Sequence, residues 1–294
     1  MTNFLTIGGR ELKLTNLDKV YWPELGITKG DMIDYYIQVS PHLLPHLKNR
    51  PFSMKPFPDG IYGQSFYQKE VPKEAPPWYQ TTPIPSGRRG FVNWGLVNDL
   101  SSLAWIANRG CIEMHAWFSR LPSLDKPDLA VLDLDPSPEV PFAQVVAVAR
   151  LFHQLLVDLK LESFPKTSGM SGLHIYIPIS PSYPFSQVRD FLLKLCQVVE
   201  QVAPELATLE RTVSKRGQRV YLDAVQNASA KTIPVPYSLR PSPQATVSTP
   251  LLWKEVNESL SPTQFTYINI LGRIKKTGEL FAPLLNLHQE LPNL

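Results

Sequence analysis

Proline is unusually frequent in this chain. It accounts for 29 of the 294 residues, which is about twice the usual proportion. Because proline lacks a backbone N–H and interrupts helix interiors, we expect many short strands and ordered turns rather than a helical bundle. The proline-rich stretch 50–86 is accordingly predicted to form extended strands and turns. The length permits one large domain or two closely packed ones.

The charge is nearly balanced, with 29 Lys and Arg residues against 26 Asp and Glu residues and a net charge of +3. This excludes a supercharged binder, so any nucleic-acid surface must be a local patch. Cys111 and Cys196 lie in apolar contexts without a zinc-site spacing, which predicts buried thiols. Residues 1–10 do not resemble a signal peptide, and no apolar run has the length of a membrane span. We therefore expect a cytoplasmic protein without a membrane partner.

Hydrophobic periodicity predicts different secondary structure in the two halves of the chain. The first half is mostly strand and turn, and it begins with a hairpin over 4–15 that turns at Gly8-Gly9. The second half alternates strands and helices, so we expect an α+β fold of two fused lobes with a boundary near residue 120. Helices are expected after a Thr28 cap, over 98–107 and 142–159, and after a Ser186 cap to about 202, and strands over 111–117, 129–135, 174–180 and 219–224.

Two carboxylates mark the end of one predicted strand. Asp133 and Asp135 are two residues apart, so they share a face of the strand, and Pro136 follows them. Like charges this close favour a divalent cation between them, and carboxylate oxygens suit Mg²⁺ or Mn²⁺. The alternative is a solvent-facing strand end that carries two surface acids.

A glycine-rich loop precedes the next predicted strand. It runs from Lys166 to His174 and contains Ser168, Gly169, Ser171 and Gly172. Glycines let a backbone approach an anion, and the loop amides and serine hydroxyls can donate to phosphate oxygens. The alternative is a glycine-rich turn followed by a structural histidine.

A third acid, Asp223, lies near the end of the strand predicted over 219–224, and cationic residues follow it at Lys231 and Arg240. Three acids could hold two metals for phosphoryl transfer, and the cations could neutralise phosphates. The basic cluster Arg211, Lys215, Arg216 and Arg219 could contact DNA or form a solvated hairpin.

In these motifs and their order, the sequence resembles the polymerase domain of bacterial ligase D, within the archaeo-eukaryotic primase superfamily. Asp133 and Asp135 match the first family motif, the Ser168–His174 loop the second and Asp223 the third. The stretches 226–241 and 245–250 are distinctive of this branch. The resemblance implies a primase-polymerase fold in which 1–120 form an N-terminal lobe, 121–260 an RRM-like catalytic lobe and 261–294 a helical tail.

The resemblance also implies roles for individual residues. Asp133 and Asp135 would bind two Mn²⁺ or Mg²⁺ ions, and Asp223 would bind the ion that activates the primer 3′-hydroxyl. Residues expected at the incoming nucleotide are Ser168, Ser171, His174, Lys231, Ser238 and Arg240. Relatives commonly have a basic residue at the positions of Ser171 and Pro56, so some contacts to the nucleotide or the backbone would be missing, unless Lys166 supplies one.

In the N-terminal lobe, Lys19 and Lys29 correspond to lysines that bind the 5′-phosphate of a broken DNA end. Lys29 is expected at a helix N-terminus, where backbone amides favour an anion. Phe66 and Tyr67 correspond to an aromatic pair that stacks on template bases. His115 also fits a family position, either as structural support or as a substrate contact. Without the resemblance, the aromatic residues would be interpreted as core and the lysines as solvated.

The resemblance implies a stand-alone polymerase for DNA repair by non-homologous end joining. It would add NTPs or dNTPs, with ribonucleotides preferred, to 3′ ends at gaps or breaks that bear a 5′-phosphate. A separate ATP-dependent DNA ligase and a Ku-type protein are the expected partners, at the nucleoid. The alternatives are a glycosyltransferase, which also uses an Asp-x-Asp motif, and a non-catalytic end-binding module that recruits a ligase. Priming without a primer is a further possible activity.

Overall fold

The computed structural model describes residues 2–87 and 90–292, and the chain divides into two compact units. The first unit comprises Met1–Trp117, Thr232–Val247 and Thr266–Lys276, and the second comprises Phe118–Lys231, Ser248–Phe265 and Thr277–Leu294. The chain first passes from one unit to the other after Trp117, whereas the boundary was expected near residue 120. Each unit is made of several separate stretches of sequence, unlike the expected lobes, because two later segments belong to the first unit. No helix in the described ranges is long and apolar enough to cross a membrane.

The first unit begins with the predicted hairpin. Strands β1 (Thr2–Ile7) and β2 (Arg10–Thr15) pair antiparallel, with Ile7 opposite Arg10. Gly8 and Gly9 both have positive φ angles, 59° and 80°, as a two-residue hairpin turn of the type I′ class requires. The hairpin over 4–15 is therefore confirmed.

Two helices of the first unit begin at side-chain caps. Helix α1 (Lys29–Leu47) starts after Thr28, whose hydroxyl accepts from the Asp31 N–H while the Asp31 carboxylate accepts from the Thr28 N–H. This reciprocal pair is a capping box, and it confirms the predicted cap at Thr28. Helix α2 (Leu100–Asn108) is capped by Asp99, whose carboxylate accepts from the Ser102 N–H. Both predicted helices are confirmed.

The first unit also contains a five-stranded sheet. Its strand order is β14-β8-β5-β7-β6, and short β3 (Val20–Trp22) and β4 (Ile27–Thr28) pair separately. The predicted strand over 111–117 was too long, because only two of its residues join the sheet while 111–114 pack irregularly in the core. The sheet strands are β5 (Pro51–Ser53), β6 (Thr81–Ser86), β7 (Gly90–Leu96), β8 (His115–Ala116) and β14 (Ile233–Pro234).

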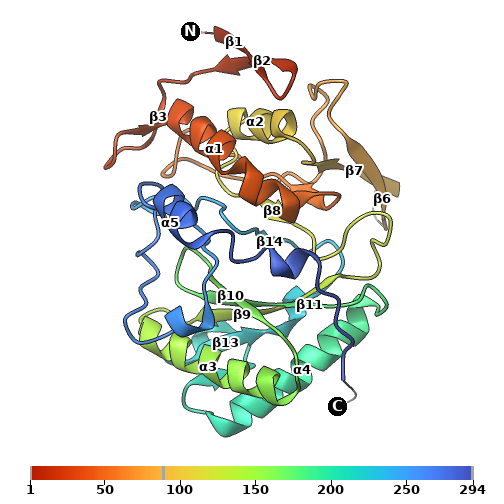
Figure 1. The fold of residues 1–294 in the computed structure, drawn as a ribbon, viewed down its shortest axis with the longest axis vertical. Helices are drawn as coiled ribbons and strands as arrows, with labels where there is room; N and C mark the ends of the chain where they lie inside the picture. Colours follow the sequence, from red (N-terminus) through yellow and green to blue (C-terminus); the bar gives the residue numbers. More distant parts are fainter. Residues whose placement is uncertain (1, 88–89, 293–294) are drawn as a thin grey trace. The chain divides into compact units, whose positions relative to one another are not determined.

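The second unit is a five-stranded sheet with order β10-β11-β9-β13-β12, covered by two helices. Apart from the parallel pair β12 and β13, neighbouring strands are antiparallel. Figure 1 shows α3 and α4 side by side along this sheet. The bounds are β9 (Leu129–Pro136), α3 (Phe142–Asp158), β10 (Phe164–Thr167), β11 (Leu173–Pro178), α4 (Phe185–Val202), β12 (Ala207–Thr208) and β13 (Val220–Asp223).

The predicted strands over 129–135, 174–180 and 219–224 and both predicted helices agree with the structure to within two residues at every end, whereas β10 and β12 were not predicted. The largest differences are at β11, which ends at Pro178, and at α4, where Pro184 rather than Ser186 precedes the first helical turn without a side-chain cap. Both cysteines are buried free thiols, as predicted. The segment expected as a helical tail contains α5 (Ile270–Thr277) and the 3₁₀ turn η4 (Pro283–Leu285). Further 3₁₀ turns are η1 (Val213–Lys215), η2 (Ala224–Gln226) and η3 (Trp253–Glu255).

Candidate active site

The second unit carries a row of polar residues across four neighbouring strands. Lys166 on β10 is the register partner of His174 on β11, which is the partner of Asp133 on β9, which is the partner of Asp223 on β13. Directly opposed residues share one face of a sheet, so all four project to the same side. The His174 Nε2 atom lies 3.4 Å from Asp133 Oδ1. The strand register thus brings together acids that are 90 residues apart in the sequence.

The opposite face of the same strands is apolar and packs against α3 and α4. Leu132 and Leu134 flank Asp133 on β9 and are buried, together with Ile175 and Leu222 on the neighbouring strands. Burying this face fixes the register, since a slip of one residue would exchange the acids with the leucines. The hydrophobic core on one side of the sheet therefore determines that the acids project from the other.

Asp135 lies one step further along β9 and pairs with a buried arginine. The Arg216 Nη1 atom is 3.1 Å from Asp135 Oδ2, and the guanidinium lies 4.1 Å above the centre of the Tyr221 ring. Arg216 also donates to the backbone oxygens of Glu210 and Arg211. Of the basic cluster around Gly217, this residue thus contacts a predicted catalytic acid, a pairing that the sequence analysis did not identify.

Asp223 is held where β13 ends. Its Oδ1 atom accepts from the Gln226 N–H at 3.1 Å and lies 3.4 Å from the Tyr221 hydroxyl. Burial, and secondarily Asp223, raises the pKa of Tyr221 to about 12. The Asn227 side chain then donates to the Val131 oxygen and accepts from the Val131 N–H. It therefore continues the ladder beside β9 and fixes the backbone two residues before Asp133.

The donor chemistry of these acids fits a divalent cation, since three carboxylates project from one face of adjacent strands. Their side chains, however, are engaged elsewhere: Asp135 with Arg216, and Asp223 with Gln226 and Tyr221. Within 2–87 and 90–292, no three His, Cys, Asp or Glu side chains are grouped to hold a metal as they stand. The residues fit such an ion by type and by strand position, and carboxylate rotation would be needed to complete a site.

The glycine-rich loop connects β10 to β11 and closes on Ser168. The Ser168 hydroxyl accepts from the N–H groups of Met170 and Gly172, each at 3.0 Å. Gly169 has a φ of 76°, and a Cβ on Gly172 would lie 2.3 Å from the Leu134 carbonyl oxygen. Both positions therefore require glycine. Two of the loop amides expected to face a phosphate are instead committed to Ser168, whereas Ser171 is exposed.

The other cations and hydroxyls expected at the nucleotide lie in different surroundings. Lys231 is exposed, while Lys166 is fully buried and donates to the Ser248 hydroxyl. In the first unit, the buried Ser238 hydroxyl accepts from the Met114 N–H at 2.8 Å. Arg240 pairs with Glu113, with 2.7 Å between Nε and Oε1. The row on the second unit therefore contains His174 but neither Ser238 nor Arg240.

Lys19 and Lys29, the residues expected to bind a DNA 5′-phosphate, lie side by side in the first unit. The Lys29 N–H donates to the Lys19 carbonyl oxygen at 2.8 Å. Lys19 is partly exposed and pairs with Asp59 at 2.5 Å. Lys29 opens α1 as expected, but it is only 4% exposed, and its Nζ donates to the Thr15 oxygen at 2.7 Å. Burial, and secondarily the charge of Lys19, lowers the pKa of Lys29 to about 8.

Phe66 and Tyr67 are exposed, at 53% and 57%, which excludes the interpretation of this pair as core. The Tyr67 ring meets the buried His115 ring edge-on, with 5.7 Å between the ring centres. The Lys55 Nζ atom lies 5.2 Å from the centre of the Tyr67 ring. An exposed aromatic pair beside a cation has the chemistry that stacks on bases of a single strand.

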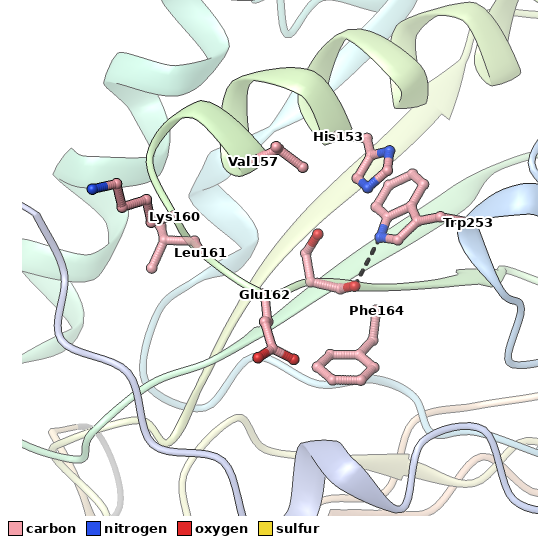
Figure 2. A pocket seen from close by; sticks show the side chains of 8 residues that line it. His153, Val157, Lys160, Leu161, Glu162, Phe164 and Trp253 are labelled. Carbon is pink, nitrogen blue, oxygen red and sulfur yellow. Dashed lines mark hydrogen bonds between the residues drawn. The ribbon is translucent and has the colours of Figure 1, made fainter.

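A separate pocket of about 400 Å³ is lined in part by α3, β10 and η3, and it includes none of the predicted site residues. Figure 2 shows His153 stacked on Trp253, whose indole N–H donates to the Ser163 oxygen. The ring centres are 3.9 Å apart, and burial, followed by Arg150, lowers the pKa of His153. Since the two rings already stack on one another, neither presents that face to a ligand.

Comparison with known proteins gives consistent matches over almost the whole chain. Residues 28–281 match the family model of the LigD primase-polymerase domain. The LigD proteins of Bacillus subtilis and Mycolicibacterium smegmatis are 36% and 34% identical over 96% and 93% of this chain, which spans 45% and 36% of their lengths. The solved polymerase domain of Mycobacterium tuberculosis ligase D, in complex with DNA, has a TM-score of 0.86 at 35% identity. That match covers 93% of this chain and 98% of the solved one.

Proposed function

This chain belongs to the LigD primase-polymerase domain family, and from that membership we propose that it adds nucleotides to DNA 3′ ends during the repair of breaks by end joining. The observation that carries the proposal is the row in which Asp133 has His174 on one side and Asp223 on the other. The chain spans less than half the length of the curated LigD proteins it matches. The ligase step and end binding by a Ku-type protein are therefore assigned to other polypeptides or segments.

The proposed reaction is nucleotidyl transfer. The primer 3′-hydroxyl forms a bond to the α-phosphorus of the incoming nucleotide, the bond to the β-phosphate oxygen breaks, and pyrophosphate leaves. Asp133, Asp135 and Asp223 would hold two divalent cations, Mn²⁺ or Mg²⁺, that lower the pKa of the hydroxyl and neutralise charge on the phosphates. His174 keeps Asp133 oriented through their 3.4 Å contact. Release of Asp135 from Arg216 would make its carboxylate available.

For the nucleotide itself, we propose Ser168, Ser171, His174, Lys231, Ser238 and Arg240 as binding residues, with a preference for ribonucleotides. The fixed turn around Ser168 supports a role for this loop as a preformed surface beside His174. The presence of Asp223 beside Asp133 supports nucleotidyl transfer over the glycosyltransferase alternative, because the Asp-x-Asp motif of that alternative does not account for a third acid. A non-catalytic end-binding module would bind the same DNA without incorporating nucleotides.

At the DNA end, we propose that Lys19 and Lys29 bind the 5′-phosphate and that Phe66 and Tyr67 stack on template bases. Replacing both lysines with alanine is expected to remove the affinity advantage of a 5′-phosphorylated gap over a 5′-hydroxyl gap, because the advantage arises from direct charge contacts. Fluorescence anisotropy with the two duplexes measures it. An equal loss of affinity for both duplexes would show that the lysines contribute only nonspecific electrostatic attraction to DNA.

The lowered pKa of Lys29 predicts a pH dependence for the same advantage. Between pH 7 and pH 9, a lysine with a pKa of about 8 loses about nine-tenths of its charge, so the preference for the 5′-phosphate is expected to fall about tenfold. Anisotropy titrations with both duplexes across this range give the ratio of dissociation constants. In Lys29→Arg the group stays charged, and the ratio should remain flat.

Unfolding would not account for such a loss. Lys29 has a lower pKa in the folded state than the value of 10.5 for an ordinary lysine. Between these two pKa values the unfolded state binds more protons, so this group makes the free energy of unfolding larger, and the fold more stable, as the pH rises. Urea unfolding at pH 7 and pH 9 provides the control. A wild-type preference that does not change with pH would contradict the assignment of Lys29 to the phosphate.

The proposed activity is tested by primer extension on a short gapped duplex with a 5′-phosphate, in the presence of Mn²⁺. We expect nucleotides to be added to the 3′ end, more readily from NTPs than from dNTPs, and EDTA to stop the addition. Incubation with nucleotide sugars instead of NTPs tests the glycosyltransferase alternative. DNA binding without incorporation under these conditions would favour the recruiting module.

A further inference from the structure

Glu113 is a fully buried carboxylate in the first unit that gathers three other side chains. It forms an ion pair with Lys55, and its Oε1 atom lies 2.7 Å from Arg240 Nε. The His115 Nε2 atom is 3.8 Å from Glu113 Oε2, beyond hydrogen-bond distance. These groups come from three segments: Lys55 follows β5, Glu113 precedes β8 and Arg240 lies after β14.

The charges of this group do not balance. Burial opposes ionisation of Glu113, but the adjacent charges of Arg240 and Lys55 hold its pKa well below the usual range. Burial lowers the pKa of His115, so this ring is neutral at pH 7. One carboxylate therefore faces two cationic side chains, which leaves one positive charge in excess. The side chains of Lys55 and Arg240 are 20% and 15% exposed, while Glu113 is completely covered.

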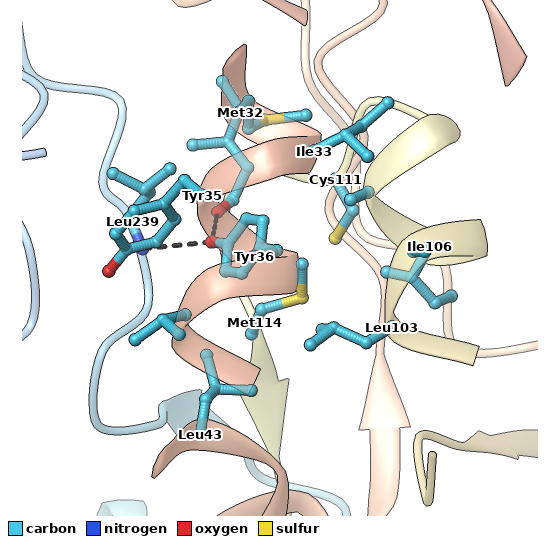
Figure 3. Packing of buried hydrophobic residues seen from close by; sticks show 14 of the residues in the cluster. Met32, Ile33, Tyr35, Tyr36, Leu43, Leu103, Ile106, Cys111, Met114 and Leu239 are labelled. Atoms are coloured by element: carbon cyan, nitrogen blue, oxygen red, sulfur yellow. Dashed lines mark hydrogen bonds between the residues drawn. The ribbon is translucent and has the colours of Figure 1, made fainter. Parts of the chain in front are cut away.

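The backbones that carry Glu113 and Arg240 are tied to each other on both sides. The Tyr36 hydroxyl accepts from the Leu239 N–H, as Figure 3 shows among the packed residues around α1. The same hydroxyl donates to the Ile112 oxygen. The Ser238 hydroxyl accepts from the Met114 N–H. The backbone neighbours of Glu113 and of Arg240 are thus fixed to one another, so Arg240 has a defined position relative to Glu113.

A contribution to folding stability does not by itself account for the buried ion pairs of Glu113. Burying a carboxylate with its partners costs desolvation free energy that the ion pairs often only offset, and apolar replacements of such groups are frequently neutral or stabilising. This cluster has excess positive charge, and its two cationic side chains are partly exposed. It also contains a neutral buried histidine beside the exposed Tyr67 ring. Such a combination suits an anion that carries an aromatic ring.

We propose that Glu113 is a positioning residue for nucleotide binding. It holds Arg240 and Lys55 in the orientation that receives the phosphates of a nucleoside triphosphate, without itself touching the substrate. This inference rests on the proposed polymerase function and on the assignment of Arg240 to the nucleotide. It assigns a role to a buried acid that the sequence analysis did not single out.

The test compares Glu113→Gln with Glu11→Gln, a matched change of an exposed glutamate on β2 of the same unit. With ATP, Mn²⁺ and a gapped duplex, we expect Glu113→Gln to raise the KM for ATP about tenfold or more with a smaller change in kcat. The dissociation constant for the gapped duplex without ATP should stay within about twofold of wild type, which also reports that the variant is folded. Glu11→Gln should match wild type in all three quantities.

A second variant covers the case in which Glu113→Gln does not fold. Glu113→Asp keeps the charge but is one methylene shorter, so it cannot hold both cations as the glutamate does, and a raised KM for ATP is again expected. Arg240→Lys should raise KM less in the Glu113→Asp background than in wild type, since coupled residues are not additive. Additive effects, or an unchanged KM in folded Glu113 variants, would overturn the proposal. Absence of incorporation by wild type would instead overturn the proposed function on which it rests.

Discussion

Replacing Asp133 or Asp223 with asparagine is expected to reduce nucleotide addition by about a thousandfold or more while leaving the affinity for a gapped duplex unchanged. Each substitution removes a negative charge from the row on the second unit, and loss of metal-based stabilisation worth about 4 kcal/mol corresponds to that factor. Single-turnover primer extension with Mn²⁺ measures the rate, and anisotropy measures the affinity.

The control for this pair is Asp125→Asn, which makes the same change at an exposed position of the second unit outside the row. Its rate should equal that of wild type. Because the side chains of Asp133 and Asp223 are only partly buried, circular dichroism spectra of all variants should coincide. Incorporation by Asp133→Asn or Asp223→Asn at the wild-type rate would show that these acids do not hold a catalytic metal.

Replacing Gly172 with alanine is expected to destabilise the second unit and to displace the loop that leads to His174. The new Cβ would lie 2.3 Å from the Leu134 carbonyl oxygen, so the backbone of β9 or of the loop must shift. Overpacking of this kind costs about 1–3 kcal/mol. Urea unfolding should show a lower midpoint with little change in slope, and the KM for ATP should rise because the Ser168 turn is disturbed.

Gly87→Ala provides the comparison, since a Cβ at this position meets no atom within 4 Å. Its free energy of unfolding should remain within about 0.5 kcal/mol of wild type. An unfolding midpoint for Gly172→Ala equal to that of Gly87→Ala would mean that the loop and β9 separate without cost. The close approach of the loop to Leu134 would then not be needed for its position.

Much of the second unit could be predicted from local sequence patterns. The alternation of Leu132, Asp133, Leu134 and Asp135 indicates both the strand and the faces of its side chains, and the structure places the leucines in the core. The helix after Thr28 was predictable because its capping box is a contact within four residues. Such features depend on neighbours in the sequence and need no knowledge of the tertiary fold.

Contacts between distant segments could not be predicted in the same way. The pairing of Arg216 with Asp135 joins residues 81 positions apart, and that of Arg240 with Glu113 depends on the return of 232–247 to the first unit. Similarly, Lys29 was expected to present its charge at a helix N-terminus, but its side chain turns to the Thr15 oxygen and is buried. Secondary-structure propensity and residue spacing do not indicate which of these side chains will meet, because such contacts depend on how the elements pack in the tertiary structure.

The most direct measurement is incorporation of a single labelled nucleotide by the wild-type protein at a one-nucleotide gap that bears a 5′-phosphate, with and without Mn²⁺. We predict that one nucleotide is joined to the primer 3′ end with release of one pyrophosphate, only when the metal is present. Stable binding of this duplex with no incorporation and no pyrophosphate release, in Mn²⁺ as in Mg²⁺, would contradict the assignment of the three acids to nucleotidyl transfer.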